Sequence, residues 1–269
     1  MDKTFLLAVI LTAFIIGAGG CNNDDKDEGD GYNEDIIKYP YTVESIEKEI
    51  NDNWELLGYT EKPTKYIALT FDDGPAAETQ DLLDILAAKQ VKATFFLIGQ
   101  NIRSNKAATK AIFDAGHELA NHSDGYDGLG GATESEKIEI SLVKASAEIK
   151  AITGKDPAFF RAPNVAYGNN LTNVCKIMGM PLIGVSVWSN DWQSSITAEQ
   201  CKSNVLNAAK DGGIINCHEA NTSKDRTLPI LGDMIDGLRA KGYWITTVSK
   251  LAVVKGKTLQ PGERYDSIN

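Results

Sequence analysis

The chain has few of the residues from which many binding sites are built. Among its 269 residues are only three histidines and four cysteines, and no two cysteines have the short C-x-x-C spacing of a zinc ribbon. Its formal net charge is −10, and without a basic stripe it does not resemble a nucleic-acid-binding protein. At most one disulfide could form among Cys175, Cys201 and Cys217, and Cys217 lies in an apolar run typical of a buried side chain.

The apolar run near the start of the chain is too short to cross a bilayer as a helix. This run, Phe5 to Ile16, follows Lys3 and is itself followed by small residues and Cys21. The order predicts a signal peptide over residues 1–20 and resembles a bacterial lipoprotein processing site; a plain signal peptide with an incidental cysteine is the alternative. We expect an exported lipoprotein of the cell envelope, with the outer-membrane surface as one alternative location. Lipid on Cys21 would be its only attachment to the membrane.

The segment after Cys21 is strongly acidic. Seven acids and a single lysine lie between residues 22 and 35, a local charge of −6. Such a stretch cannot bury apolar area, so it predicts a disordered tether over residues 21–40. A similar acidic tract follows the lipidated cysteine in certain bacterial surface lipoproteins.

Strand and helix patterns then alternate over most of the chain. Apolar runs typical of buried strands occur at 66–71, 93–98, 118–121, 158–161, 182–187, 213–217 and 244–248. Helical spacing occurs between them at 77–89, 105–115, 133–152, 170–178, 197–210 and 228–241. A further helix over 41–57 is predicted within an N-terminal extension of residues 41–60.

The alternation predicts an α/β fold with a mainly parallel sheet and helices outside it. Seven strands favour an incomplete or distorted (β/α)7 barrel over residues 61–254, and an open doubly wound sheet is the alternative. Two helix starts fit capping boxes, Thr133 with Glu136 and Thr197 with Gln200. The polar tail, residues 255–269, is expected on the surface.

Polar residues gather where these strands end. Asp72 and Asp73 close the first run, directly before Gly74 and Pro75, and later strand ends carry His122, Arg161, Asp191 with Trp192, and His218. Chemistry in barrels and open parallel sheets lies at the carboxyl ends of strands. We therefore expect these residues to form one site.

The adjacent carboxylates of Asp72 and Asp73 are the strongest single signal. At the mouth of a strand they repel each other and lose hydration, which favours a metal, an arginine or a proton beside them. An Asp-Asp-Gly turn, with one acid capping the helix that begins near Ala77, is the structural alternative.

Five motifs, in this order, resemble those of the polysaccharide deacetylases, the NodB-homology carbohydrate esterases of family 4. They are Thr70-Phe71-Asp72-Asp73-Gly74-Pro75; Gly116-His117-Glu118 with Asn121-His122-Ser123; Arg161-Ala162-Pro163; Asp191-Trp192; and Ile214-Ile215-Asn216-Cys217-His218. The resemblance covers roughly residues 65–251. It implies metal-assisted hydrolysis of N- or O-linked acetyl groups on a polysaccharide or glycan fragment, with release of acetate.

The resemblance also implies a role for each matching residue. Asp73 and His122 would bind a divalent metal, usually zinc, with cobalt or nickel as alternatives. Asp72 would be the general base and His218 the general acid, while Arg161 would orient the base. Further assignments are Asp191, which would set the charge state of the general acid, and the substrate contacts Trp188, Tyr167, Pro163 and Asn164.

One departure from the family pattern concerns the second histidine ligand, which is expected four residues after His122. Tyr126 occupies that position. A phenol with a pKa near ~10 is a weak ligand unless a metal deprotonates it, so Asp124 or Asp127 is an alternative carboxylate ligand. His117 precedes its strand and is predicted to be structural.

Two other motifs also depart from the pattern. The segment Arg161 to Asn164 lacks the usual proline and aromatic residues of the third motif, and Trp188 stands where the fourth commonly starts with an acid. Trp188, Trp192 and Tyr167 could form a wall that stacks on sugar rings, although core packing is favoured for Trp192.

Three functional hypotheses follow. The first is a metal-dependent glycan deacetylase, and the second is a glycan-binding relative that has lost catalysis because Tyr126 replaces a ligand. Retention of both Asp72 and His218 favours the enzyme, because a binding site does not need a base and an acid. A metal-free hydrolase using the same two residues is the third.

Overall fold

The computed structural model describes residues 39–126, 135–219 and 224–269. The predicted signal peptide, Cys21 and nearly all of the acidic tether lie outside the described residues, as do Asp127 and Thr133. In the described part, no helix combines the length and hydropathy needed to cross a bilayer.

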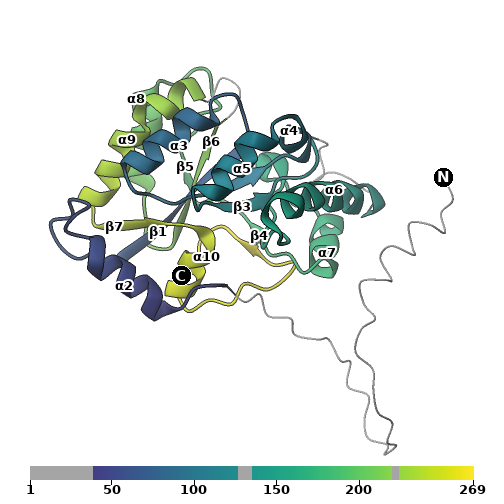
Figure 1. Cartoon of the computed structure of the whole chain (residues 1–269), viewed down its shortest axis with the longest axis horizontal. Helices are drawn as coiled ribbons and strands as arrows, with labels where there is room; N and C mark the ends of the chain where they lie inside the picture. Colours follow the sequence, from purple (N-terminus) through teal and green to yellow (C-terminus); the bar gives the residue numbers. More distant parts are fainter. Residues whose placement is uncertain (1–38, 127–134, 220–223) are drawn as a thin grey trace, which may run out of the picture. The chain divides into compact units, whose positions relative to one another are not determined.

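A parallel sheet lies at the centre of the molecule (Figure 1). In spatial order the strands are β3 (Glu118–Asn121), β2 (Thr94–Leu97), β1 (Lys65–Gly74), β6 (Gly213–His218) and β5 (Val187–Trp188), with β7 (Tyr243–Thr246) beside β1. The middle strand, β1, has β6 on one side; on the other side its amino-terminal half pairs with β7 and its carboxyl-terminal half with β2. Because every pair is parallel, the carboxyl ends of these strands face the same way.

Short bridges extend this sheet toward a distorted barrel. Phe160 bridges both Asn121 of β3 and Leu182 of β4 (Leu182–Ile183). The predicted strand 158–161 is therefore reduced to a single bridging residue. The predicted strand 182–187 is divided into β4 and β5, because the carbonyls of Ile183 and Gly184 accept hydrogen bonds from the Arg161 side chain instead of a neighbouring strand.

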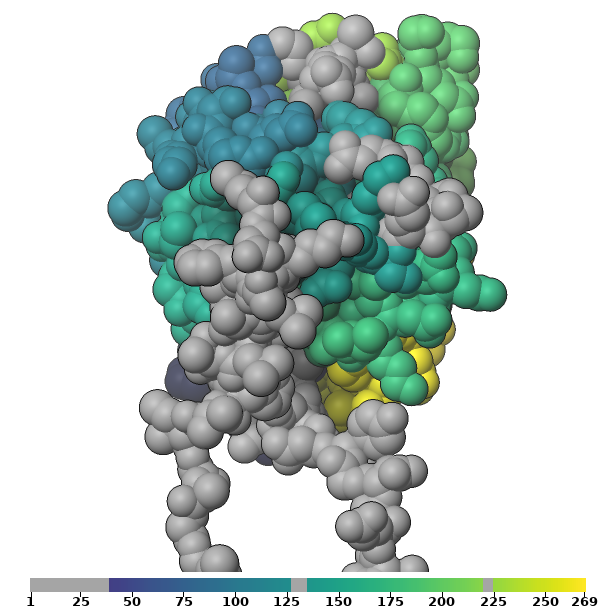
Figure 2. All heavy atoms as spheres, turned by 90° about the vertical axis from the view of Figure 1, so that its right-hand side faces the viewer, coloured from purple at the N-terminus to yellow at the C-terminus, as the bar shows by residue number. Residues whose placement is uncertain are grey.

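The C-terminal segment connects the two sides of the barrel. Its strand β8 (Arg264–Tyr265) pairs with β4, and Ser267 bridges Gly213 of β6. In Figure 2 these yellow residues lie against the green middle of the chain. The expectation that residues 255–269 lie on the surface is wrong for Leu259 and Ile268, which are both 1% exposed, because they complete the core on this side.

Helices cover the outside of the sheet (Figure 1). The helix predicted in the N-terminal extension forms as α2 (Val43–Asn53). The six predicted between strands are α3 (Thr79–Ala88), α5 (Lys106–Asp114), α6 (Ser135–Thr153), α7 (Asn169–Ile177), α8 (Ala198–Ala208) and α9 (Lys224–Ala240). The capping box at Thr197 and Gln200 is confirmed. Two short helices are new, α4 (Gly99–Ser104) and α10 (Val248–Val254), because one turn or two gives little periodicity.

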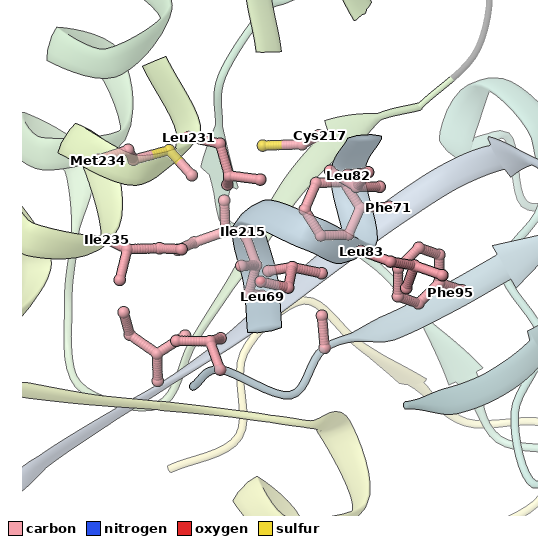
Figure 3. Close-up of a cluster of buried hydrophobic side chains, with 14 of the residues drawn as sticks. Leu69, Phe71, Leu82, Leu83, Phe95, Ile215, Cys217, Leu231, Met234 and Ile235 are labelled. Atoms are coloured by element: carbon pink, nitrogen blue, oxygen red, sulfur yellow. The ribbon is translucent and has the colours of Figure 1, made fainter. Parts of the chain in front are cut away.

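The main core lies between the sheet and helices α3 and α9. Figure 3 shows Leu69 and Phe71 of β1 packed with side chains from both helices. Alternate residues of a strand face opposite ways, so Thr70 and Asp72 face the barrel interior. The three cysteines of the described residues, Cys175, Cys201 and Cys217, are free and buried, which confirms the prediction for Cys217.

Candidate active site

Asp72 is held by two buried partners. Its side chain is 3% exposed; Oδ1 accepts a hydrogen bond from Arg161 Nη1 at 2.7 Å and Oδ2 accepts one from Asn216 Nδ2 at 2.8 Å. Asn216 and Asp72 come from neighbouring strands, two pairs apart in the β1–β6 register and therefore on the same face of the sheet. The anion is therefore compensated although it is out of water.

Arg161 is fully buried, and its donors are distributed over several acceptors. Besides Asp72, its guanidinium donates to Thr70 Oγ1 at 2.7 Å and to the carbonyls of Ile183 and Gly184, each at 3.1 Å. It also lies 3.9 Å from the centroid of the Phe96 ring. Such a network fixes the guanidinium plane, and with it the direction in which Asp72 points.

Asp73 leaves the strand geometry of its neighbour. The register of β1 against β2 passes from Asp72 to Gly74, which marks a bulge at Asp73, and Asp73 has φ 75°. In a regular strand the two acids would face opposite sides of the sheet, whereas a bulge re-aims a side chain. Asp73 Oδ1 thereby lies 3.4 Å from His122 Nε2, and Asp72 Oδ2 lies 4.0 Å from the same nitrogen.

His122 has a defined tautomer. Its Nδ1 lies 2.8 Å from the carbonyl oxygen of Arg161, and because a carbonyl only accepts, Nδ1 carries a proton. Nε2 is then the nitrogen that faces the two carboxylates, where it either donates a proton to Asp73 or, when deprotonated, offers a lone pair to a metal. A carbonyl partner on the far nitrogen is typical of a metal-binding histidine.

The pKa of Asp73 is lowered. Burial acts to raise it, but a hydrogen bond from His122, the charges of His122 and His218, and a hydrogen bond from the Tyr126 hydroxyl together outweigh burial. The carboxylate form is thus favoured at this position. The Asn101 side chain donates to the Asp73 carbonyl at 2.7 Å and fixes the bulge from the other side.

The alternative ligand Asp124 has other partners in this structure. Its carboxylate pairs with Arg103 Nη1 at 2.7 Å, and its backbone N–H donates to Ser141. The ion pair with Arg103 on α4 would have to break before Asp124 could replace the second histidine, and its role as a ligand stays a prediction. Across the part of the chain that the structure describes, no three His, Cys, Asp or Glu side chains are placed to hold a metal. The hydroxyl oxygen of Tyr126 lies beside Asp73 and His122 and is a further ligand atom for a metal at this position. Tyr126 is 55% exposed.

His117 is structural, as predicted. It is 6% exposed, its Nδ1 accepts a hydrogen bond from the Ala93 N–H at 3.1 Å, and its ring meets the edge of Phe95. Burial and the charge of Lys92 lower its pKa to about 4.

His218 and Asp191 form a second pair of groups. His218 Nδ1 donates to Asp191 Oδ1 at 2.7 Å, and the backbone N–H of His218 donates to Oδ2 at 2.7 Å. Thr227 also donates to Oδ2, and Arg226 donates to the Asp191 carbonyl. Burial lowers the pKa of His218, but the hydrogen bond and charge of Asp191, with Asp72 and Asp73, raise it overall to about 9. His218 is therefore an imidazolium at neutral pH.

Aromatic side chains border His218. The Trp188 and Trp192 rings meet edge to face at 5.4 Å, and Trp192 lies 5.6 Å from the His218 ring. The expectation of core packing for Trp192 is wrong: the residue is 42% exposed, because it follows Asp191 in the loop at the strand end.

The other predicted substrate contacts are placed differently. The Tyr167 hydroxyl donates to the Ile183 carbonyl at 2.9 Å, and Arg264 lies 4.5 Å from the centroid of its ring. That ring packs with the core near α7. Pro163 is buried, while Asn164 is exposed in a short 3-10 turn, η2 (Pro163–Val165).

Sequence reasoning missed Asn216 and Glu219. The signal for Asn216 was a polar residue two places before His218, hence on the same face of β6. Glu219 is 2% exposed; Thr79 donates to its Oε2 at 3.0 Å, and its Oε1 has no hydrogen-bond partner among the described residues. Burial and the charge of Asp73 raise its pKa to about 8. A Cβ atom on Gly74 would lie 1.2 Å from Glu219 Oε1, so any other residue there would force the Glu219 side chain to move.

Comparison with known proteins identifies relatives of this site and fold. Residues 59–183 match the family described as polysaccharide deacetylase. The chain is 39% identical over 202 residues to a bifunctional xylanase/deacetylase of Pseudobutyrivibrio xylanivorans. This match covers 75% of this chain and 32% of that protein. It is also 32% identical over 205 residues to a peptidoglycan-N-acetylglucosamine deacetylase of Listeria monocytogenes, and this match covers 76% of this chain and 42% of that protein. The chain thus spans less than half the length of these two curated relatives.

Solved structures agree with these matches. A family 4 acetyl xylan esterase from Clostridium thermocellum, in complex with a cobalt ion, has a TM-score of 0.71 and 35% identity, covering 76% of this chain and 99% of that one. A mutant of a family 4 pseudoenzyme from Bacillus anthracis, with restored activity, has a TM-score of 0.64 and 28% identity. The match covers 70% of this chain and 68% of that one.

The fold and these relatives define the class, a distorted-barrel domain of the kind found in carbohydrate esterases and deacetylases. Within that class the chain belongs to the polysaccharide deacetylase family, carbohydrate esterase family 4. This family generally uses a divalent metal, and the cobalt-bound relative is an example.

Proposed function

We propose that this chain is a metal-assisted deacetylase that hydrolyses N- or O-linked acetyl groups on a polysaccharide or glycan fragment. The observation that carries the proposal is the convergence of Asp72 and Asp73 on Nε2 of His122, at 4.0 and 3.4 Å. Because Nδ1 donates to the Arg161 carbonyl, Nε2 is the nitrogen that could give a lone pair to a cation held between it and the two carboxylates. A divalent cation neutralises such an arrangement.

Asp73 and His122 would hold the metal, with zinc the first choice and cobalt or nickel as alternatives. Carboxylate and imidazole are both ordinary zinc ligands, and Tyr126 oxygen stands beside them where the family has a second histidine. When bound, a divalent metal polarises the acetyl carbonyl and lowers the pKa of a water molecule.

Asp72 would be the general base. Each of its oxygens accepts one hydrogen bond, from Arg161 and from Asn216, which leaves further lone pairs on the carboxylate. The buried Arg161 pairs with the carboxylate and holds it toward His122. Asp72 would take the proton from the water that attacks the acetyl carbon.

His218 would be the general acid. Its Nδ1–H is bound to Asp191, so Nε2–H is left for the leaving group. As the bond from the acetyl carbon to nitrogen or oxygen breaks, His218 would give its proton to the departing amine or alkoxide. The products are acetate and a free amine or hydroxyl, and Asp191 stabilises the imidazolium before transfer.

The glycan would lie along the exposed face of Trp192. Aromatic faces stack on the apolar faces of sugar rings, and Trp192 adjoins both Trp188 and His218. Xylan and peptidoglycan are the candidate polymers, because the relatives include a xylanase/deacetylase and a peptidoglycan deacetylase.

A glycan-binding relative without catalysis is the second candidate function. Tyr126 favours it, since only two family ligands, Asp73 and His122, remain, and one structural relative is a pseudoenzyme. The buried Arg161–Asp72 pair and the raised pKa of His218 favour the enzyme, because glycan binding requires neither.

The experiment is acetate release by metal-stripped protein given zinc, cobalt or nickel. The substrates are acetylated xylan, acetylated chitooligosaccharide and peptidoglycan fragments, with Asp72→Asn as the inactive control. We expect release from at least one substrate, dependent on metal and abolished in the control. Metal binding and glycan binding without acetate release would instead establish the binding protein.

We also propose export as a lipoprotein modified at Cys21, with residues 1–20 removed. This rests on the order of charge, apolar run, small residues and cysteine. Labelled palmitate should enter the chain in a bacterial host and should not enter the Cys21→Ser variant. Equal labelling of both would overturn the proposal.

A further inference from the structure

A cavity of about 340 Å³ lies beside the half of β1 that is farther from the acids. Its wall includes Trp244, Ile245 and Thr246 of β7, which pairs with Lys65–Ala68 of β1. Tyr66 and Asp72 are six residues apart, so at about 3.3 Å per residue the two regions are separated by roughly 20 Å along the strand. The cavity is therefore distinct from the candidate active site.

The N-terminal extension supplies one wall of the cavity. Glu49, Asn53 and Leu57 line it and precede residue 59, where the family match begins. The wall is anchored by Tyr59, whose hydroxyl donates to the Tyr243 carbonyl at 2.8 Å and whose ring stacks on Trp244 at 5.7 Å. The extension is thus a fixed part of the cavity.

Arg239 lines the same cavity as a buried cation without a counter-charge. It is 8% exposed, it donates to the Lys89 carbonyl and to the Tyr59 hydroxyl, and its guanidinium lies 5.8 Å from the centroid of the Tyr59 ring. Among the residues that the structure describes, its Nε has no acceptor and no carboxylate forms an ion pair with it. Guanidinium groups stay protonated, and a buried charge that lacks a partner is costly. A bound anion would supply that partner.

The remaining charges of the cavity add to this preference. Lys250 is paired with Glu49, whereas the exposed Lys92 donates to the Ala115 carbonyl at 2.7 Å and forms no ion pair among the described residues. The buried Arg239 and the exposed Lys92 are therefore two cations without a paired carboxylate that line one cavity of a chain whose net charge is −10.

Neutral polar groups indicate what the anion is attached to. Asn53, Gln90 and Thr246 also line the cavity. The Asn53 side-chain N–H donates to the Glu49 carbonyl at 2.7 Å, and amide and hydroxyl groups such as these suit the hydroxyls of a sugar. The volume is at the small end for ligand pockets, enough for a single ring. We propose that this cavity binds an acidic sugar, a hexuronate, whose carboxylate pairs with Arg239. The site binds without chemistry, and it goes beyond deacetylation because it does not use the carboxylates of β1.

The test is calorimetric titration of the whole chain with glucuronate, galacturonate, glucose and inorganic phosphate. We expect a hexuronate to bind at least tenfold more tightly than glucose and phosphate. Equal binding of glucose would overturn the role of the cation, and tighter binding of phosphate would overturn the sugar assignment.

Two variants test whether the ligand binds in this cavity. Ala87→Phe fills the cavity from α3 without altering Arg239, and Ala88→Phe, the next exposed residue, does not line it. Hexuronate affinity should fall at least tenfold in Ala87→Phe and stay unchanged in Ala88→Phe. Arg239→Gln should lose binding too; if that variant fails to fold, as circular dichroism would show, Ala87→Phe decides. Unchanged affinity in Ala87→Phe would overturn the proposal, and acetate release plays no part in this readout.

Discussion

Arg161 contacts His122 through its backbone and Asp72 through its side chain. The carbonyl of Arg161 lies 2.8 Å from His122 Nδ1, and its guanidinium lies 2.7 Å from Asp72 Oδ1. One residue therefore fixes both the tautomer of the imidazole and the direction of the carboxylate that faces it. A substitution of its side chain should disturb Asp72 while the carbonyl contact to His122 is retained.

Replacing Arg161 should be strongly destabilising. Arg161→Gln leaves the buried Asp72 carboxylate without its cationic partner, a loss of about 3–5 kcal/mol in the free energy of unfolding. Urea denaturation measures it. The control is Lys48→Gln, whose ion pair with Asp52 is exposed and should change stability by less than about 1 kcal/mol. Equal effects of the two substitutions would contradict the role of the buried pair.

The charge of His218 should depend on Asp191. The pKa of His218 is raised to about 9, above its ordinary value, so its stabilising charge is fully present below about pH 6.5 and lost as the pH rises through about 9. Acetate release should fall over the same alkaline range. In Asp191→Asn both the pKa and this alkaline limb should shift down by at least about one unit.

NMR titration of the histidine rings measures that shift residue by residue. His117, with a pKa of about 4 set by burial and Lys92, is an internal control that should not respond to Asp191→Asn. A His218 pKa that stays near 9 in the variant would show that Asp191 is not the cause.

Tyr126 should limit the affinity for metal. In Tyr126→His an imidazole replaces a phenol beside Asp73 and His122, and we expect zinc to bind at least about tenfold more tightly. Tyr126→Phe removes the hydroxyl that bonds to Asp73 and should not gain affinity. Calorimetry gives both values; weaker zinc binding by Tyr126→His would show instead that the tyrosine is itself a ligand of a working site.

Glu219 should make the protein less stable as the pH rises. Its pKa is raised from an ordinary 4.5 to about 8, so the folded state binds a proton that the unfolded state has lost. Stability therefore falls between about pH 4.5 and pH 8 from this group. Glu219→Gln removes that slope, and its stability relative to the parent should rise across the window.

Urea midpoints at pH 5, 6.5 and 8 test this. Glu55→Gln, at an exposed position, is the matched control and should follow the parent at every pH. A constant difference between Glu219→Gln and the parent would mean that the carboxyl does not titrate in that window.

Local features of the fold could be predicted because they depend on neighbouring residues. Apolar runs gave the positions of β1, β2, β3, β6 and β7, and Thr197 with Gln200 gave the start of α8. Side-chain spacing could not show that the carbonyls of Ile183 and Gly184 turn toward Arg161 and interrupt a strand. That contact joins residues more than twenty places apart.

Within the site, the sequence by itself determined that Asp72, Asp73, His122, Arg161 and His218 would meet, because parallel strands bring their carboxyl ends to one edge. Only the tertiary structure decided their partners. It turned Asp124 toward Arg103, placed Asn216 on Asp72, buried Glu219 against Gly74, and left Arg239 Nε without an acceptor among the described residues. Hydrogen bonds and ion pairs depend on angstrom-scale distances between segments remote in sequence, and hydrophobic periodicity carries no information about those distances.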